Sequence, residues 1–504
     1  MSNRVSVKAL SGSMALSISN FVYTAISALG SIAVARLLGP ADYGVISIAL
    51  IYPIMFSGLA DLGLSTAIMR YASLGDLKSA STALWLRVFM SLLLALALVP
   101  LAPYLATMLQ RPYLTPMIYI LAVYSFASGT LSSVTAFLAG VNRYWDLALV
   151  NTALAVVKVS SSIALVLAGY GVYGAAWGFS IGYSLAALYA FTKLLRSTNP
   201  ALNLTRRSLA EVLGYSIPLY IPGLIGIPLS QFYNILRAIY VSNVEIGNYQ
   251  VASNLLVPIS IVTSSMSTAL FTTLPQLINE EYKFKGAVDR AARYIALVVA
   301  PIATALAIFS KYAVYIVYGS QYELAPLYLS IMALSSLLAP FGVVVMYLNI
   351  IGATRTTMVL NIANMLTGLP ITWILLVNYG MLGAVVASVV NSIIGTVVSL
   401  TVVKRMYSVN IKVMGVIKYL APSLIAGALT YPIIRAVRGM WLTLGIGFTS
   451  YSALLVMLIV VVVSKEDLMH LVSISRSMKY IGSIISYTLD MVVKIKVLLC
   501  RQQA

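Results

Sequence analysis

The sequence has very few residues of the types that bind metals or form disulfides. Its 504 residues include one cysteine, Cys500, and one histidine, His470. One cysteine excludes an intramolecular disulfide, and without a Cys/His cluster there is little material for a metal site. No GxxxxGK sequence followed by Ser or Thr is present, which leaves the chain without a phosphate-binding loop of its own. We therefore expect neither a metal nor a cofactor.

Charged residues are also scarce, at 9% of the chain, whereas 61% of the residues are hydrophobic and the mean hydropathy is +0.96. These values lie far outside the range of soluble globular proteins. A membrane-spanning helix needs about 20 mostly apolar residues. The sequence predicts an all-α polytopic membrane protein with about 14 transmembrane helices, over 11–36, 42–64, 82–104, 115–139, 147–169, 173–194, 212–241, 247–274, 292–318, 325–350, 357–378, 382–403, 414–434 and 441–463.

The basic residues are distributed unequally between the two sides of these spans. If both termini are cytoplasmic, 25 of the 32 Lys and Arg residues fall on the inner side, and only Arg111, Arg435 and Arg438 fall outside. This is the positive-inside pattern of a multi-pass protein in the cell membrane. The net charge of +19 therefore indicates topology and contact with anionic membrane lipids, and not binding of nucleic acid.

The second half of the chain repeats motifs of the first. ADYGVISIAL (41–50) is similar to GNYQVASNLL (247–256), and Gly140 and Arg143 match Gly352 and Arg355. Six spans separate the copies, so the repeats are parallel and predict two six-helix lobes around a central cavity, an architecture of transporters. The predicted parts are an N-terminal lobe (1–195), a cytoplasmic linker (196–211), a C-terminal lobe (212–406), two additional transmembrane helices (407–463) and an amphipathic cytoplasmic tail (464–504).

Three stretches also carry a family resemblance. ARLLGPADYGVISIAL (35–50), LADLGLSTAIMRYAS (59–73) and EIGNYQVASNLL (245–256) resemble the polysaccharide-flippase branch of the multidrug/oligosaccharidyl-lipid/polysaccharide (MOP) exporter superfamily. The resemblance implies translocation of an oligosaccharide linked to polyprenyl phosphate or pyrophosphate from the cytoplasmic to the outer leaflet. One departure is QFYNILR (231–237), where many relatives have an acid and this chain has Asn234.

Four basic residues lie within apolar segments, namely Arg36, Lys158, Arg237 and Lys311. A charge in the hydrocarbon region costs at least about 2.5 to 3.5 kcal/mol, so it usually faces a cavity or a partner. We expect Arg36, Arg237 and Lys158 to contact an anionic head group, because an Arg fork suits phosphate oxygens. The alternatives are snorkelling for Arg36 and a structural partner between helices for Lys158. Snorkelling is the expectation for Lys311.

Asp61 is the one acid clearly inside a predicted span. We expect it to pair with Arg70 as a helix-end salt bridge, and a coupling site for Na⁺ or H⁺ is the alternative. Every outer connection is short, which leaves no room for an extracytoplasmic catalytic domain. We therefore predict a flippase for lipid-linked glycans and not an enzyme. The alternatives are an ion-coupled multidrug exporter of the same superfamily, which would need acids in its cavity, and a polytopic cell-envelope enzyme.

Overall fold

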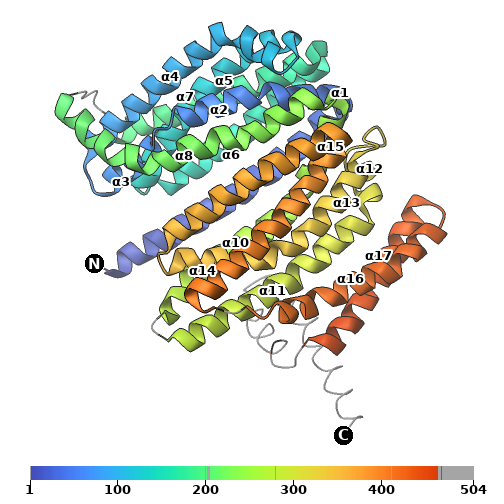
Figure 1. The fold of residues 1–504 in the computed structure, drawn as a ribbon. Coiled ribbons are helices and arrows are strands. Elements are labelled where there is room, and N and C mark those ends of the chain that lie inside the picture. Colours follow the sequence, from blue (N-terminus) through green and yellow to red (C-terminus); the bar gives the residue numbers. More distant parts are fainter. Residues whose placement is uncertain are drawn as a thin grey trace. The chain divides into compact units, whose positions relative to one another are not determined.

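The computed structural model describes residues 2–198, 200, 205–278, 280–409, 411–463 and 467 (Figure 1). These residues form helices joined by short turns, with no strand among them. Ten of the described helices are long and apolar enough to cross a membrane, or eleven if the bent pair Arg206–Ile221 and Gly226–Tyr240 counts as one span. The predicted all-α class is confirmed, and the number of about 14 spans stays a prediction.

Three of these helices are much longer than one membrane crossing requires. Ile18–Leu59, Tyr144–Arg196 and Thr354–Tyr407 contain 42, 53 and 54 residues, whereas about 20 suffice. Each is broken at a glycine with positive φ, at Gly39 (77°), Gly169 (91°) and Gly380 (59°), a conformation that glycine adopts without steric cost. Gly39 and Gly380 lie between two spans expected from hydropathy, and Gly169 is the last residue of the expected span 147–169.

The chain divides into two compact units. The first contains residues 1–251, 317–323 and 376–384. Its helices are α1 (Ser2–Ala49), α2 (Ile51–Leu59), α3 (Leu64–Ser73), α4 (Leu77–Met108), α5 (Thr115–Gly140), α6 (Tyr144–Leu165), α7 (Gly171–Thr198), α8 (Arg206–Tyr240) and the start of α9 (Asn243–Leu255), with short η1 (Pro112–Leu114) and η2 (Val166–Tyr170) turns. Leu64, Leu84 and Phe137 are fully buried in its core. The helices of this unit pack against one another through apolar side chains of this kind.

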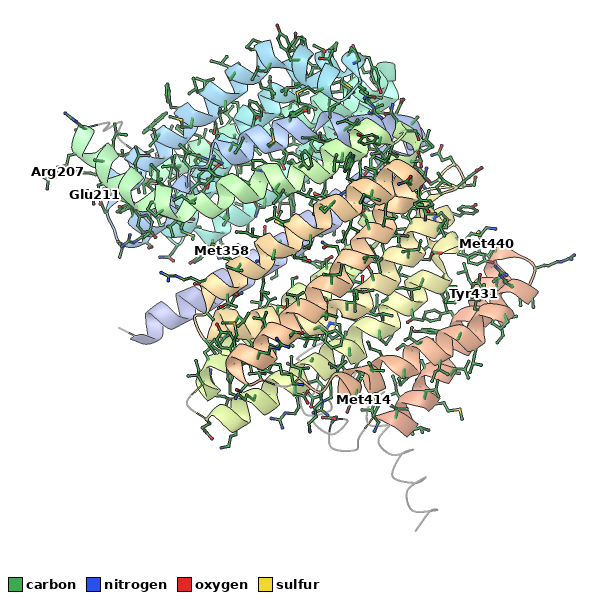
Figure 2. The ribbon with its side chains drawn as sticks, in the orientation of Figure 1. Arg207, Glu211, Met358, Met414, Tyr431 and Met440 are labelled. Atoms are coloured by element: carbon green, nitrogen blue, oxygen red, sulfur yellow. The ribbon has the colours of Figure 1, made fainter. Side chains whose placement is uncertain are left out.

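The second unit contains residues 252–316, 324–375 and 385–504. Its helices are α10 (Val257–Thr273), α11 (Glu281–Ile308), α12 (Ser310–Val317), α13 (Ala325–Ser335), α14 (Val343–Ile350), α15 (Thr354–Tyr407) apart from residues 376–384, α16 (Val413–Ala436) and α17 (Met440–Val462), with η3 (Leu274–Leu277) and η4 (Ser336–Gly342). Val288, Ala292 and Val299 of α11 are fully buried in its core. Figure 2 shows the side chains, including Met414 and Tyr431 on α16.

The amphipathic tail predicted over 464–504 lies outside the described residues, apart from Asp467. Residues 199 and 201–204 of the predicted linker lie outside them as well. The division into lobes 1–195 and 212–406 stays a prediction.

Candidate functional site

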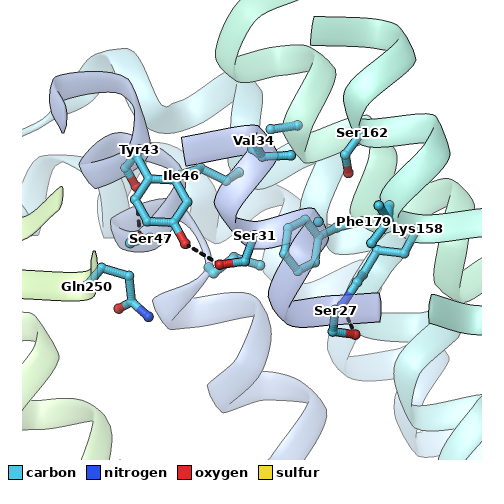
Figure 3. Close-up of a pocket in the computed structure, with 14 residues that line it drawn as sticks. Ser27, Ser31, Val34, Tyr43, Ile46, Ser47, Lys158, Ser162, Phe179 and Gln250 are labelled. Carbon is cyan, nitrogen blue, oxygen red and sulfur yellow. Dashed lines mark hydrogen bonds between the residues drawn. The ribbon is translucent and has the colours of Figure 1, made fainter. Parts of the chain in front are cut away.

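Lys158 lines a small polar pocket in the first unit. The pocket has a volume of about 150 Å³ and lies among α1, α6, α7 and the start of α9 (Figure 3). Beside Lys158, its polar lining consists of Ser27, Ser31, Tyr43, Ser47, Ser162 and Gln250. These side chains are neutral donors and acceptors, so among the described residues of the pocket wall the Lys158 ammonium is the only charge.

Glycines bring the helices close together around Lys158. A Cβ atom at Gly182 of α7 would lie 2.6 Å from the Lys158 Cα atom, and one at Gly30 of α1 would lie 2.2 Å from Val159. Real Cβ atoms do not approach other atoms so closely, so only glycine permits this packing. The backbone of α6 is therefore fixed between α1 and α7 at the position that carries the lysine.

The partners of Lys158 are a hydroxyl group and two aromatic rings. Its Nζ atom donates to Ser27 Oγ at 3.4 Å and lies 5.5 Å and 5.6 Å from the ring centroids of Tyr23 and Phe179. No carboxylate lies within 4.0 Å of Nζ among the residues that the structure describes. The hydroxyl group and the rings are neutral partners, so they do not compensate the positive charge, and an anionic ligand can do so.

Arg237 lines a second pocket of about 210 Å³ in the same unit. Its guanidinium lies over the ring of Tyr249, with Cζ 4.6 Å from the centroid, and Asn234 donates to Gln231 Oε1 at 2.9 Å on the same wall. Ser47, Leu50 and Gln250 line both this pocket and the Lys158 pocket. The structure therefore places two cations on either side of one shared polar wall.

Arg36 lies outside both pockets. It is exposed, and its Nε atom donates to the Val317 carbonyl oxygen at 2.7 Å. Gln321 Nε2 donates to the Arg36 carbonyl at 3.1 Å, and Tyr322 donates to the Ala35 carbonyl at 2.7 Å. Arg36 thus joins α1 to the segment 317–323. The structure brings Lys158 and Arg237 to adjoining pockets and does not bring Arg36 there.

Asp61 pairs with Arg87 and not with Arg70, so that expectation was wrong. Its Oδ1 atom lies 3.3 Å from Arg87 Nε and accepts from Ser65 Oγ at 2.5 Å. Arg70 is in the last turn of α3, whereas Asp61 lies in the turn that precedes this helix. The Arg70 guanidinium instead packs on the ring of Tyr215, with Cζ 4.1 Å from the centroid.

Sequence reasoning missed the neutral residues of the shared wall. Ser47 lies in the motif at 41–50, and Tyr249 and Gln250 lie in its second copy at 247–256. The recurrence of those two motifs was the signal available in the sequence, because the repeated segments themselves form part of both pockets.

Comparisons with known proteins agree with this architecture. Residues 33–326 match the family model described as polysaccharide biosynthesis protein. The chain belongs to this family. A relative in Rhizobium meliloti (strain 1021), the succinoglycan biosynthesis transport protein ExoT, is 22% identical over 328 residues, which cover 63% of this chain. The match spans 64% of that relative's own length.

Solved structures show the same fold. A lipid II flippase, MurJ, in an inward closed conformation is similar with a TM-score of 0.73 and 16% identity, over 88% of this chain and 98% of that one. An inward-facing multidrug resistance MATE family transporter of the MOP superfamily is similar with a TM-score of 0.61 and 17% identity, over 76% of this chain and 96% of that one. The polysaccharide-biosynthesis family is shown by the family model, the fold is that of these solved transporters, and the chain is a multi-pass membrane protein.

Proposed function

We propose that the protein moves lipid-linked oligosaccharide or polysaccharide precursors from the cytoplasmic to the outer leaflet by alternating access, for the synthesis of cell-surface glycans. The observation that carries this proposal is the pair of adjoining pockets in which Lys158 and Arg237 face neutral polar groups and aromatic rings. The family of the chain supports the glycan class, since ExoT is named for succinoglycan transport.

The chemistry of the pockets suits a phosphate-bearing head group. An ammonium and a guanidinium supply positive charge for phosphate oxygens, and the Arg fork adds two parallel donors. Ser47 and Gln250, on the wall that both pockets share, offer hydrogen bonds to sugar hydroxyls. A cationic drug would face repulsion in these pockets, because the described lining contains no acid. The pocket charge therefore disfavours the multidrug alternative.

The finer features follow from the same proposal. The carrier is a polyprenyl phosphate or pyrophosphate, the membrane is the cell membrane, both termini are cytoplasmic, and the inner surface contacts anionic lipids through its excess of Lys and Arg. The protein acts as a transporter and not as an enzyme, with lobes 1–195 and 212–406 and with Na⁺ or H⁺ as the candidate coupling ions.

The test is transfer of a fluorescent polyprenyl-pyrophosphate oligosaccharide between the leaflets of proteoliposomes. We expect Lys158→Gln and Arg237→Gln each to slow transfer at least tenfold, because each removes a charge that compensates the phosphate. Arg405→Gln is the matched control, since Arg405 is exposed at the end of α15 and lines neither pocket. Circular dichroism and thermal unfolding establish that the variants are folded. Native transfer rates in both pocket variants, or extrusion of a cationic dye by the native chain without lipid transfer, would overturn the proposal.

A further inference from the structure

The second unit contains a larger cavity with two basic residues of its own. Its volume is about 850 Å³, and it lies among α11, α12, α13 and α16. The polar residues that line it are Thr304, Ser310, Lys311, Tyr312, Ser330, Tyr431 and Arg435. It shares no lining residue with the Lys158 or Arg237 pockets.

The charge of this cavity is not neutralised by its lining. Lys311 Nζ lies 5.7 Å from the ring centroid of Tyr315, and Arg435 Cζ lies 4.8 Å from that of Tyr431. Neither cation forms an ion pair with an acid in the part of the chain that the structure describes. Both side chains are exposed, and Tyr431 lies on α16 and lines the cavity (Figure 2). The cavity therefore presents two positive charges to an anionic ligand.

The packing of α16 on α11 shapes the cavity. A Cβ atom at Gly427 would lie 2.4 Å from Thr304 Cγ2, so the two helices touch at this glycine. Arg435 is in the last turn of α16, two turns beyond Gly427, where a cation also complements the helix dipole. Lys311 is in the first turn of α12, directly after α11 ends at Ile308. The two cations thus lie at the same end of the contact between α11 and α16.

Apolar side chains lie beside the charges. Leu334 and Leu424 line the cavity and are 44% and 39% exposed, respectively. Exposed leucines on membrane-spanning helices face acyl chains, whereas an inorganic anion would gain nothing from them. A volume of about 850 Å³ lies within the range of roughly 300 to 1,000 Å³ of small-molecule sites. The lining fits an amphiphile that has a phosphate at one end.

We propose that this cavity binds the phosphodiester of an anionic phospholipid of the outer leaflet, with the phosphate between Lys311 and Arg435 and the chains along Leu334 and Leu424. With both termini in the cytoplasm, as proposed above, Arg435 lies on the outer side, which selects that leaflet. The bound lipid would hold α16 against α11 and α13. This inference does not depend on the identity of the transported glycan.

The test is lipid binding to the full-length protein in detergent, measured by native mass spectrometry and by the thermal unfolding temperature. Phosphatidylglycerol is the probe, and phosphatidylcholine and inorganic phosphate are the comparisons. We expect stabilisation and retained adducts with phosphatidylglycerol only. Each of Lys311→Gln and Arg435→Gln should weaken binding roughly fivefold, as expected for the loss of one charge near a membrane anion. Arg438 follows the end of α16 and does not line the cavity, so Arg438→Gln should leave binding unchanged.

Three results would overturn the proposal. Equal binding of phosphatidylcholine would show that the charges do not select the lipid, and equal stabilisation by inorganic phosphate would show a simple anion site. Native affinity in the Lys311→Gln/Arg435→Gln double variant would exclude these residues. Lys311 and Arg435 are exposed, so the variants should unfold at the native temperature without lipid, which separates a lost site from a lost fold.

Discussion

Arg87 and Lys158 both lie between helices of the first unit, and their partners differ in kind. Arg87 is 3% exposed and pairs with Asp61, and its Nη1 atom also donates to the Ser57 carbonyl at 3.3 Å. Lys158 faces a hydroxyl group and two rings beside a pocket. A buried charge is tolerated when it is paired, and a charge without an acid is tolerated where it reaches a polar cavity. The first arrangement serves the fold, and the second is suited to a ligand.

The same division recurs elsewhere in the chain. Asp146 is 8% exposed and pairs with Arg143 at 2.5 Å and with Lys193 at 3.3 Å. Arg293 of the second unit pairs with two acids, Asp289 and Asp467. The chain has only 13 acidic residues, and several of them neutralise basic residues where helices meet. None of the acidic residues that the structure describes lines the Lys158 or Arg237 pocket.

The largest loss of stability is expected for Asp61→Asn. This change leaves Arg87 buried without its counter-charge, and breaking a buried pair from one side costs about 3 to 5 kcal/mol. Thermal unfolding of the purified protein measures the loss, and Asp61→Asn/Arg87→Gln should recover part of it because no unpaired charge remains. A native unfolding temperature together with a loss of Na⁺- or H⁺-dependent transport would instead make Asp61 a coupling residue.

A smaller loss is expected for Asp467→Asn. Asp467 is 5% exposed, accepts from Tyr294 at 3.2 Å and from Tyr419, and pairs with Arg293 at 3.3 Å. The change should cost about 1 to 3 kcal/mol, since Arg293 keeps Asp289 at 3.6 Å while the buried Tyr419 and the half-buried Tyr294 lose a charged acceptor. The same thermal unfolding assay applies. If the cost is no larger than that of the surface change Glu280→Gln, the contacts of Asp467 with Arg293, Tyr294 and Tyr419 do not stabilise the second unit.

The control for Asp467→Asn is Glu280→Gln. Glu280 pairs with Lys283 at 2.5 Å, but the two side chains are 54% and 66% exposed. Surface pairs of this kind contribute about 0 to 1 kcal/mol. The two carboxylates lie in the same unit, so the difference between the variants measures the effect of burial on an acid that pairs with a basic residue.

The fold class and the family were predictable from the sequence, whereas the number of spans was not. Apolar runs of membrane length and motifs such as ADYGVISIAL can be read from short stretches of the sequence. The apolar runs form long helices in the structure. Successive spans continue into one another as long helices that bend at Gly39, Gly169 and Gly380. Hydropathy shows that both spans of such a pair are apolar, but it does not show whether the helix continues through the bend between them.

The candidate site was predictable only through its charges. Lys158 and Arg237 are conspicuous because charge is rare in an apolar segment, whereas Ser47 and Gln250 carry little such signal and were missed. The partner of Asp61 was also missed, because Arg87 lies on another helix and pairs through tertiary packing. Contacts between helices depend on close approaches such as that of Gly182 to Lys158, which the sequence does not reveal.

A loss of about 1 kcal/mol at neutral pH is expected for Asp76→Ala, because Asp76 is the N-cap of α4 and its carboxylate accepts from the Ser79 N–H at 3.1 Å. Hydrogen bonds from Ser79 lower the pKa of Asp76 below its ordinary value. The contribution is therefore fully present above the unfolded-state pKa and is lost as the pH falls through the folded-state pKa. Unfolding temperatures of the two proteins should differ at pH 7 and converge at acidic pH. A difference independent of pH would exclude the carboxylate as its source.

The smallest effect on stability is expected for Lys158→Met, which keeps the length of the side chain and removes its charge. No acid in the described residues loses a partner, so the free energy of unfolding should change by less than about 0.5 kcal/mol, while lipid transfer is lost. The matched variant is Lys193→Met, which removes a cation that pairs with Asp146 and should lower stability with little effect on transfer. If Lys158→Met instead destabilises the protein as strongly as Asp61→Asn, Lys158 is a structural cation like Arg87. Unchanged stability together with lost transfer would show that the positive charge of Lys158, which has no acidic partner among the described residues, serves the ligand.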